Sequence, residues 1–355
     1  MKYTLILLIL LMSNITFGQK NPFTQVINDY NAEKNFNGTV LVATDGKIDY
    51  MNAVGVANRQ TGSKINSKTK FKIASITKAF TAVLILQLYQ QGKIDLYTPF
   101  KIYYPNYKGN AKETVTIEHL LTYSSSIPDE IGKLEMKTFK SPLTLDDYID
   151  KYCSKDIVGD PGEKSNYSNT EYIILTKIIE IVTQKSYETV LKENILKPLK
   201  MNNSGLIKSK FEINGLTKSY TIDDGTKTAN LDEEYFAQNY FGAGAMYSTA
   251  EDLLKFNTEI FEGQLLNKDM VKLMIKPNPK LNNAAFGVWY ADGYGTFSKP
   301  FIYRTGGILG ACSNWIYTLD DKRCIIVFNN TNGTNLYEMS EQLYLVAKEQ
   351  KPTKK

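Results

Sequence analysis

The sequence predicts an α/β (α+β) fold, with an antiparallel sheet built from both ends of the chain, flanked by helices, and a mostly helical insertion between the ends. Two observations support this prediction. Strand-like apolar runs gather near the two ends, within residues 40–56 and 286–328. Between them, apolar residues recur at the spacing of three and four that is typical of helices.

The first strand pair is indicated by the dipeptide Asp45-Gly46, which lies between two apolar runs and supplies the positive φ angles of a tight hairpin turn. The pair covers residues 40–43 and 48–56, and the later strands are expected at 286–290, 301–305, 315–318 and 324–328. Helices are expected at residues 75–91, 145–153, 170–183, 187–195, 250–261 and 336–347. Ser248 or Thr249 is the expected cap of the helix at 250–261.

The N-terminus is typical of a secretory signal peptide. Lys2 precedes a mostly apolar run of about ten residues, too short for the roughly 20 that span a bilayer, and cleavage is expected near Gly18. We therefore expect a signal peptide at residues 1–18 and a periplasmic or secreted protein with no stable membrane span after cleavage. An uncleaved anchor is the alternative.

The rest of the chain is expected to form one domain, residues 19–350, followed by a polar tail at 351–355. Its α/β part would be discontinuous, at about 22–72 and 283–350, and its helical part would cover about 73–282. A hydrophobic content of 43% suits a globular core. We expect a monomer.

Composition argues against several classes of function. The net charge of +5 includes three lysines in the tail and gives no reason to expect nucleic acid as a partner. His119 is the single histidine, and the sequence contains neither a Cys-x-x-Cys pair nor a phosphate-binding loop, so we expect no metal and no cofactor. A Ser-His-Asp hydrolase is disfavoured because no Gly-x-Ser-x-Gly elbow is present. His119 is expected to be a structural residue of a helix at 117–121.

The three cysteines are expected to remain unpaired. In the expected hairpin register Cys324 lies opposite about residue 317, while Cys312 lies some five residues further along, roughly 16 Å away at the rise of a strand. A disulfide between these two is therefore not expected. We interpret Cys153, Cys312 and Cys324 as small buried hydrophobic residues.

The candidate nucleophile is Ser75, which is followed three residues later by Lys78 at the start of a long apolar run. Positions i and i+3 share a face of a helix, so the lysine amine can reach the hydroxyl that it has to deprotonate. The free backbone N–H groups of a first helical turn also favour negative charge at this position. Ser67 and Lys70 repeat the pattern, but they lie in a Lys-rich polar stretch with no apolar run behind it. We interpret Ser67 as an exposed surface residue.

Two further motifs follow in a fixed order. The first is Tyr167-Ser168-Asn169, preceded by Pro-Gly-Glu-Lys at 161–164, and the second is Arg-Thr-Gly-Gly at 304–307. With Ser-x-x-Lys they resemble the motif set of serine β-lactamases and penicillin-binding proteins, in particular the class C β-lactamase-like branch, in which Tyr-x-Asn replaces Ser-Asp-Asn. Residues 71–74, 92–96, 116–122 and 242–253 are also similar to blocks of this family. The resemblance implies an α/β domain beside a helical domain, with the site between them.

The residues suggest the following roles. Lys78 is the expected base for Ser75, because partial burial beside other cations lowers the pKa of a lysine. The resemblance further implies that Tyr167 carries protons, that Asn169 holds the substrate amide and steadies Lys78, and that the backbone N–H groups of Ser75 and Gly307 form the oxyanion hole.

Arg304, Thr305 and Gly306 are the remaining candidates for substrate binding. Relatives commonly have Lys or His where this chain has Arg304, and Arg cannot exchange protons. The chain has 42 basic residues but only three arginines, so an arginine at this motif position is unusual for it. We therefore expect Arg304 to bind a substrate carboxylate.

The leading hypothesis is a secreted serine acyl hydrolase that forms a Ser75 acyl-enzyme with a small-molecule or peptide substrate. The motifs do not distinguish β-lactams, D-alanyl peptides and esters. A non-catalytic or single-turnover receptor for penicillin or peptidoglycan is the alternative from another class.

Overall fold

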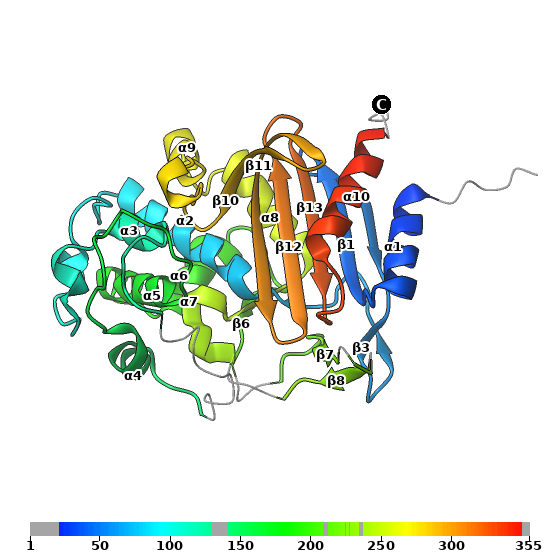
Figure 1. Cartoon of the computed structure of the whole chain (residues 1–355), viewed down its shortest axis with the longest axis horizontal. Coiled ribbons are helices and arrows are strands. Elements are labelled where there is room, and N and C mark those ends of the chain that lie inside the picture. Colours follow the sequence, from blue (N-terminus) through cyan, green and yellow to red (C-terminus); the bar gives the residue numbers. More distant parts are fainter. Residues whose placement is uncertain are drawn as a thin grey trace, which may run out of the picture.

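The computed structural model describes residues 21–129, 141–208, 212–223, 225–226, 228–233 and 237–349. Its centre is a six-stranded sheet in which all neighbouring strands are antiparallel. Across the sheet the strands are β10 (Trp289–Tyr294), β11 (Phe297–Ile308), β12 (Ala311–Thr318), β13 (Arg323–Asn329), β1 (Gly38–Thr44) and β2 (Lys47–Ala53). The N-terminal strand β1 pairs with the C-terminal strand β13 (Figure 1), which confirms a mixed fold with a sheet built from both chain ends. The predicted signal peptide and polar tail lie outside the described residues.

The central strands are buried on both faces, which explains their continuous apolar sequences. Along β1, Val40 and Val42 contact the cluster formed by α1 (Pro22–Glu33) and α10 (Leu336–Glu349). Their neighbours Leu41 and Ala43 belong to the cluster on the opposite face, which includes α8 (Ala250–Phe261). Figure 1 shows α1 and α10 together on one side of the sheet and α8 on the other.

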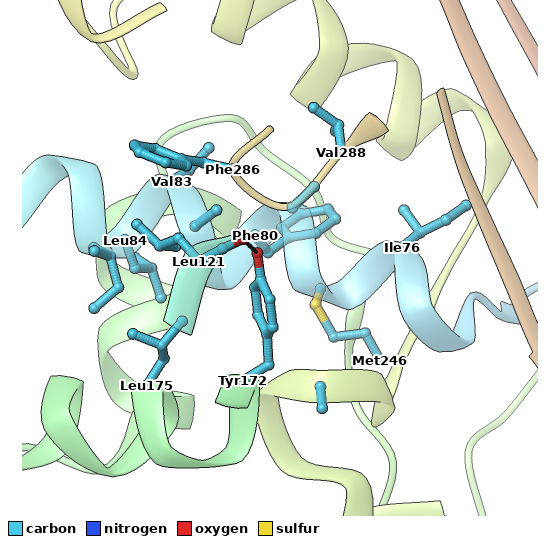
Figure 2. Close-up of a cluster of buried hydrophobic side chains, with 14 of the residues drawn as sticks. Ile76, Phe80, Val83, Leu84, Leu121, Tyr172, Leu175, Met246, Phe286 and Val288 are labelled. Carbon is cyan, nitrogen blue, oxygen red and sulfur yellow. Dashed lines mark hydrogen bonds between the residues drawn. The ribbon is translucent and has the colours of Figure 1, made fainter. Parts of the chain in front are cut away.

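The helices between the chain ends pack mainly around α2 (Thr77–Gln90), which is apolar on all sides and has eleven of its fourteen residues buried. Figure 2 shows side chains from several segments packed around it, and the hydroxyl of Tyr172 donates a hydrogen bond of 2.9 Å to the carbonyl of Leu121. The other helices are α3 (Ile117–Leu121), α4 (Leu145–Tyr148), α5 (Thr170–Thr183), α6 (Tyr187–Leu191), α7 (Phe241–Gly244) and α9 (Lys268–Met274). Two π-helical turns, Ile149–Cys153 and Lys192–Leu196, continue α4 and α6. No helix in the part of the chain that the structure describes is long and apolar enough to cross a bilayer.

Most expected helices are present. The bounds of α5 and α8 agree with the prediction, and the side chain of Thr249 caps α8 by accepting a hydrogen bond from the N–H of Asp252. Helices α1, α7 and α9 were not expected. The short strands outside the central sheet were not expected either. Two pairs form, β3 (Val56–Asn58) with β4 (Ser63–Lys64) and β7 (Tyr220–Ile222) with β8 (Ala229–Leu231). A three-stranded sheet consists of β5 (Phe71–Lys72), β9 (Met246–Ser248) and β6 (Gly205–Leu206).

The hairpin of β12 and β13 has the expected register. Cys324 pairs with Tyr317, and Cys312 pairs with Asn329 at the other end of the ladder. All three cysteines are free, as predicted. One detail of the prediction was wrong, because Cys312 is only partly buried while Cys153 and Cys324 are buried.

Candidate active site

Ser75 lies in a 3₁₀ turn, Ala74–Ile76, immediately before α2 rather than inside the helix as predicted. Ala74 has a φ of 43°, a left-handed conformation that is unfavourable for a residue with a Cβ. Neighbouring segments hold the turn, because the N–H of Ile73 donates to the carbonyl of Met246 and the carbonyl of Ile73 accepts from the hydroxyl of Ser313. The nucleophile candidate is therefore fixed by contacts from two other strands.

Lys78 is fully buried in the first turn of α2 and uses its amine three times. Its Nζ atom lies 3.2 Å from Ser75 Oγ, 2.7 Å from Asn169 Oδ1 and 2.7 Å from the carbonyl oxygen of Ala243. Burial, together with the positive charge of Arg304, lowers the pKa of Lys78 to about 8. Near neutral pH the neutral amine, which is able to accept a proton, is thus a minority form but far more populated than in an ordinary lysine.

Tyr167 lies in the loop before α5, and its hydroxyl is 2.7 Å from Ser75 Oγ. The same hydroxyl accepts a hydrogen bond of 3.1 Å from Arg304 Nη2. Burial alone would raise the pKa of Tyr167, but the cations Lys78 and Arg304 outweigh it and lower this pKa to about 8. The phenol and the amine next to Ser75 therefore have similar pKa values, a condition that favours proton transfer between them.

Arg304 enters the site from β11 and is almost completely buried. Its Nε atom donates to the carbonyl oxygen of Ser75 at 3.0 Å, in addition to the contact of Nη2 with Tyr167. Its third nitrogen, Nη1, is buried without a hydrogen-bond partner. The side chain thus fixes the nucleophile turn and the tyrosine, while a role of Arg304 in binding a substrate carboxylate stays a prediction.

A cavity of about 290 Å³ opens over the nucleophile. It is lined by Ser75, Tyr167, Trp289, Arg304, Thr305 and Gly307. Gly307 faces this space, since a Cβ added there would meet no atom within 4 Å.

Gly306 faces the other way, where an added Cβ would lie 2.3 Å from the carbonyl oxygen of Ile73 and 3.0 Å from the backbone nitrogen of Ser75. The absence of a side chain at Gly306 therefore makes room for the nucleophile turn, and the role of Gly306 in substrate binding stays a prediction. Asn169 does not line this cavity either, and it contacts Lys78 instead.

The site also contains an aromatic wall that the sequence motifs did not indicate. Tyr123 stacks on Trp289 with ring centroids 5.5 Å apart and lies 5.0 Å from the ring of Tyr167. It has a φ of 57°, so its backbone conformation is also unfavourable. The only signal was its position directly after the family-like block at 116–122.

Two residues set aside from the sequence behave as expected. His119 is part of the capping box of α3, where it exchanges hydrogen bonds with Thr116, and it takes no part in the contacts around Ser75. Ser67 is exposed. Tyr167, Asn169 and Lys78 instead gather at Ser75, although the roles assigned to them remain predictions.

The fold and this arrangement of side chains define a serine hydrolase. The sequence profile of the β-lactamase family matches residues 23–348, and the chain belongs to this family. Among its relatives are the putative penicillin-binding protein PbpX of Bacillus subtilis, 28% identical with 90% of this chain and 77% of the relative covered, and a teichoic acid D-alanine hydrolase of Staphylococcus aureus, 28% identical with 95% and 81% covered.

Solved structures show the same fold. A D-amino acid amidase from Ochrobactrum anthropi has a TM-score of 0.81 at 22% identity, with 93% of this chain and 98% of that chain covered. An octameric penicillin-binding protein homologue from Pyrococcus abyssi has a TM-score of 0.80 at 24% identity, with 94% and 78% covered. Because that homologue is octameric, the monomer expected for this chain stays a prediction.

Proposed function

We propose that the protein is an exported serine acyl hydrolase that forms an acyl-enzyme on Ser75. The observation that carries the proposal is the position of one hydroxyl, Ser75 Oγ, within 2.7 Å of the Tyr167 hydroxyl and 3.2 Å of Lys78 Nζ. A primary hydroxyl is a weak nucleophile at neutral pH, and a base at this distance is what activates it.

The proposed reaction has two stages. The Tyr167–Lys78 pair takes the proton of Ser75 as Oγ bonds to the substrate carbonyl carbon, and the same proton then passes to the leaving amine or alkoxide as its bond to that carbon breaks. A water molecule attacks the resulting ester and gives a proton to the pair. The pair returns this proton to Ser75 Oγ as the ester bond breaks, which regenerates Ser75 and releases the acid product. The backbone N–H groups of Ser75 and Gly307 are the proposed donors to the oxyanion in both stages.

The edge of β11 supports this assignment. Its pairing with β10 ends at Trp289 and Tyr303. Beyond this point residues 304–308 pair with β12 on one side, and no described strand pairs with them on the other. A substrate backbone can therefore lie along this free edge beside Thr305 and Gly307.

D-alanyl esters and amides are the proposed substrates, with β-lactams as analogues that acylate the same serine. The relatives support this choice, because their names include a D-alanine hydrolase and penicillin-binding proteins. Export remains part of the proposal and depends on the predicted signal peptide.

A turnover panel tests the proposal. Purified protein is assayed with nitrocefin, a D-alanyl peptide and a short-chain nitrophenyl ester, alongside Ser75→Ala and the matched control Ser67→Ala. We expect multiple turnovers of at least one substrate, lost in Ser75→Ala and retained in Ser67→Ala. One equivalent of acylation without further turnover would support the receptor alternative, and unchanged turnover in Ser75→Ala would refute the nucleophile.

A further inference from the structure

Tyr123 is buried, and its ring lies against four side chains at or beside the site. Its ring centroid is 5.0 Å from that of Tyr167, 5.3 Å from that of Tyr172 and 5.5 Å from that of Trp289. The guanidinium carbon of Arg304 lies 5.6 Å from the centre of the same ring, within the range in which a cation is attracted to an aromatic face. One ring thus contacts both Tyr167 and Arg304, which hydrogen-bond to each other beside the nucleophile.

The backbone of Tyr123 also holds the loop that carries Tyr167. The N–H of Asn166, the residue before Tyr167, donates a hydrogen bond of 2.7 Å to the carbonyl of Tyr123. A second bond of 2.8 Å joins the N–H of Gly162 to the carbonyl of Ser124. The position of Tyr167 is therefore set by the main chain at Tyr123 as well as by its ring.

The backbone of Tyr123 has an unfavourable conformation, with a φ of 57°. A residue with a Cβ loses free energy in this region, whereas glycine adopts it readily. Such residues persist where the surroundings fix them, and they gather at active sites. A glycine at position 123 would relieve the strain but would provide no ring for Arg304 and Tyr167, so the conformation points to a functional need for the aromatic side chain.

The ring of Tyr123, rather than its hydroxyl, makes these contacts. The hydroxyl oxygen is buried and has no hydrogen-bond partner among the described residues. Burial also raises the pKa of Tyr123 well above its usual range, while the cations around Tyr167 lower the pKa of that residue to about 8. Tyr123 therefore stays protonated near neutral pH and does not exchange protons with Ser75.

We propose that Tyr123 is a positioning residue: its ring holds the guanidinium of Arg304 against the Tyr167 hydroxyl, and its carbonyl fixes the loop that carries Tyr167. The role goes beyond the proposed function, because it belongs to a residue outside the three motifs and to a contact that precedes any substrate. It rests on that function only where catalysis is the readout.

The first test replaces Tyr123 by Leu, which removes the ring but still excludes water from Tyr167. The hydrogen bond of 3.1 Å from Arg304 to Tyr167 should then lengthen. Because the charge of Arg304 helps to lower the pKa of Tyr167, this pKa should rise. We expect the acidic limb of the kcat/KM profile to move to higher pH, with a loss of about tenfold or more near neutral pH. In an Arg304→Met background the same substitution should cause little further shift, because both changes act on one contact.

Two other variants separate positioning from stability. Tyr123→Phe keeps the ring and the carbonyl, and it should retain the native pH profile and most of the rate. Phe100 is equally buried, packs on Tyr107 and does not line the cavity over Ser75. Phe100→Leu should lower the melting temperature without moving the acidic limb. An unmoved limb in Tyr123→Leu, or an equal loss in Tyr123→Phe, would refute the positioning role, and Tyr123→Met replaces Tyr123→Leu if that protein does not fold.

A titration without substrate separates this inference from the proposed function. Formation of tyrosinate is followed by ultraviolet absorbance, and the step near pH 8 is assigned to Tyr167 by its absence from Tyr167→Phe. We expect this step to move to higher pH in Tyr123→Leu and to stay in place in Tyr123→Phe and Phe100→Leu. A shifted step supports the inference even if the protein hydrolyses none of the substrates, which would count against the proposed function alone. A step that Tyr123→Leu leaves unmoved refutes the inference, whatever the protein hydrolyses.

Discussion

Replacing Arg304 by Met removes a buried cation that contacts both Tyr167 and the Ser75 turn, while an unbranched side chain still fills the space of its aliphatic part. A hydrogen bond to a charged group contributes about 1.5 to 3 kcal/mol, or some tenfold to over a hundredfold in kcat/KM. Arg304 donates two such bonds, at 3.0 and 3.1 Å. We therefore expect Arg304→Met to lower kcat/KM by at least about tenfold for every substrate, neutral esters included.

The pH dependence of kcat/KM should also change in Arg304→Met. Burial lowers the pKa of Lys78 to about 8, and the charge of Lys78 lowers that of Tyr167 to about 8. Arg304 adds to both shifts, so its removal raises both values. Because the base form lies above the pKa, the acidic limb of the kcat/KM profile should move to higher pH, and raising the pH should recover part of the lost rate. Arg304→Lys keeps the charge and should move this limb less.

Comparison of substrates tests the remaining donor of Arg304. If Nη1 binds a carboxylate, β-lactams and D-alanyl peptides should lose about a further tenfold relative to a neutral ester. The exposed Arg59 gives a matched control, and Arg59→Met should leave both the rates and the pH profile unchanged. An unshifted profile in Arg304→Met would refute the contact with Tyr167 as a determinant of its pKa, and equal losses for all substrates would refute the carboxylate role.

Three further predictions concern Tyr167, the two glycines of β11 and the cysteines of β12 and β13. Tyr167→Phe should lower turnover by about 10² or more, measured with the preferred substrate, and unchanged turnover would leave Lys78 as the base alone. Gly306→Ala should lower the melting temperature because its Cβ would meet the carbonyl oxygen of Ile73 at 2.3 Å, whereas Gly307→Ala, which meets no atom within 4 Å, should not; equal shifts would contradict the assigned orientations. Intact mass with and without reduction should reveal no bridge between Cys312 and Cys324, and a two-dalton shift mapped to that pair would contradict the register of β12 and β13.

The sheet could be predicted because its central strands are buried on both faces and are therefore continuously apolar, as in β1 and β13. Strand β10 was predicted to begin at residue 286 but begins at Trp289. Gly287 explains the difference, since it has a φ of 77° and approaches α2 so closely that an added Cβ would lie 2.8 Å from the carbonyl oxygen of Lys78. Such a packing constraint between distant segments leaves no local signal.

The candidate site, too, could be predicted from the sequence only in part. Ser75, Lys78 and Tyr167 could be selected because each is part of a motif whose chemistry requires those residue types. Tyr123 could not, because its position depends on the packing of its ring against Trp289, a residue far away in the sequence. Helix α1 had an apolar spacing at Phe23, Ile27 and Tyr30, but only the packing against the sheet shows that this face is buried.

Mapping of the trapped acyl-enzyme shows which residue is the nucleophile. The native protein is quenched in acid during turnover of a β-lactam or ester, and the adduct is located by peptide mass spectrometry. We expect one acyl group per chain on Ser75, absent from Ser75→Ala, that accumulates further in Tyr167→Phe if deacylation also needs the tyrosine. An adduct on Ser67 or on another residue, or undiminished labelling of Ser75→Ala, would contradict it.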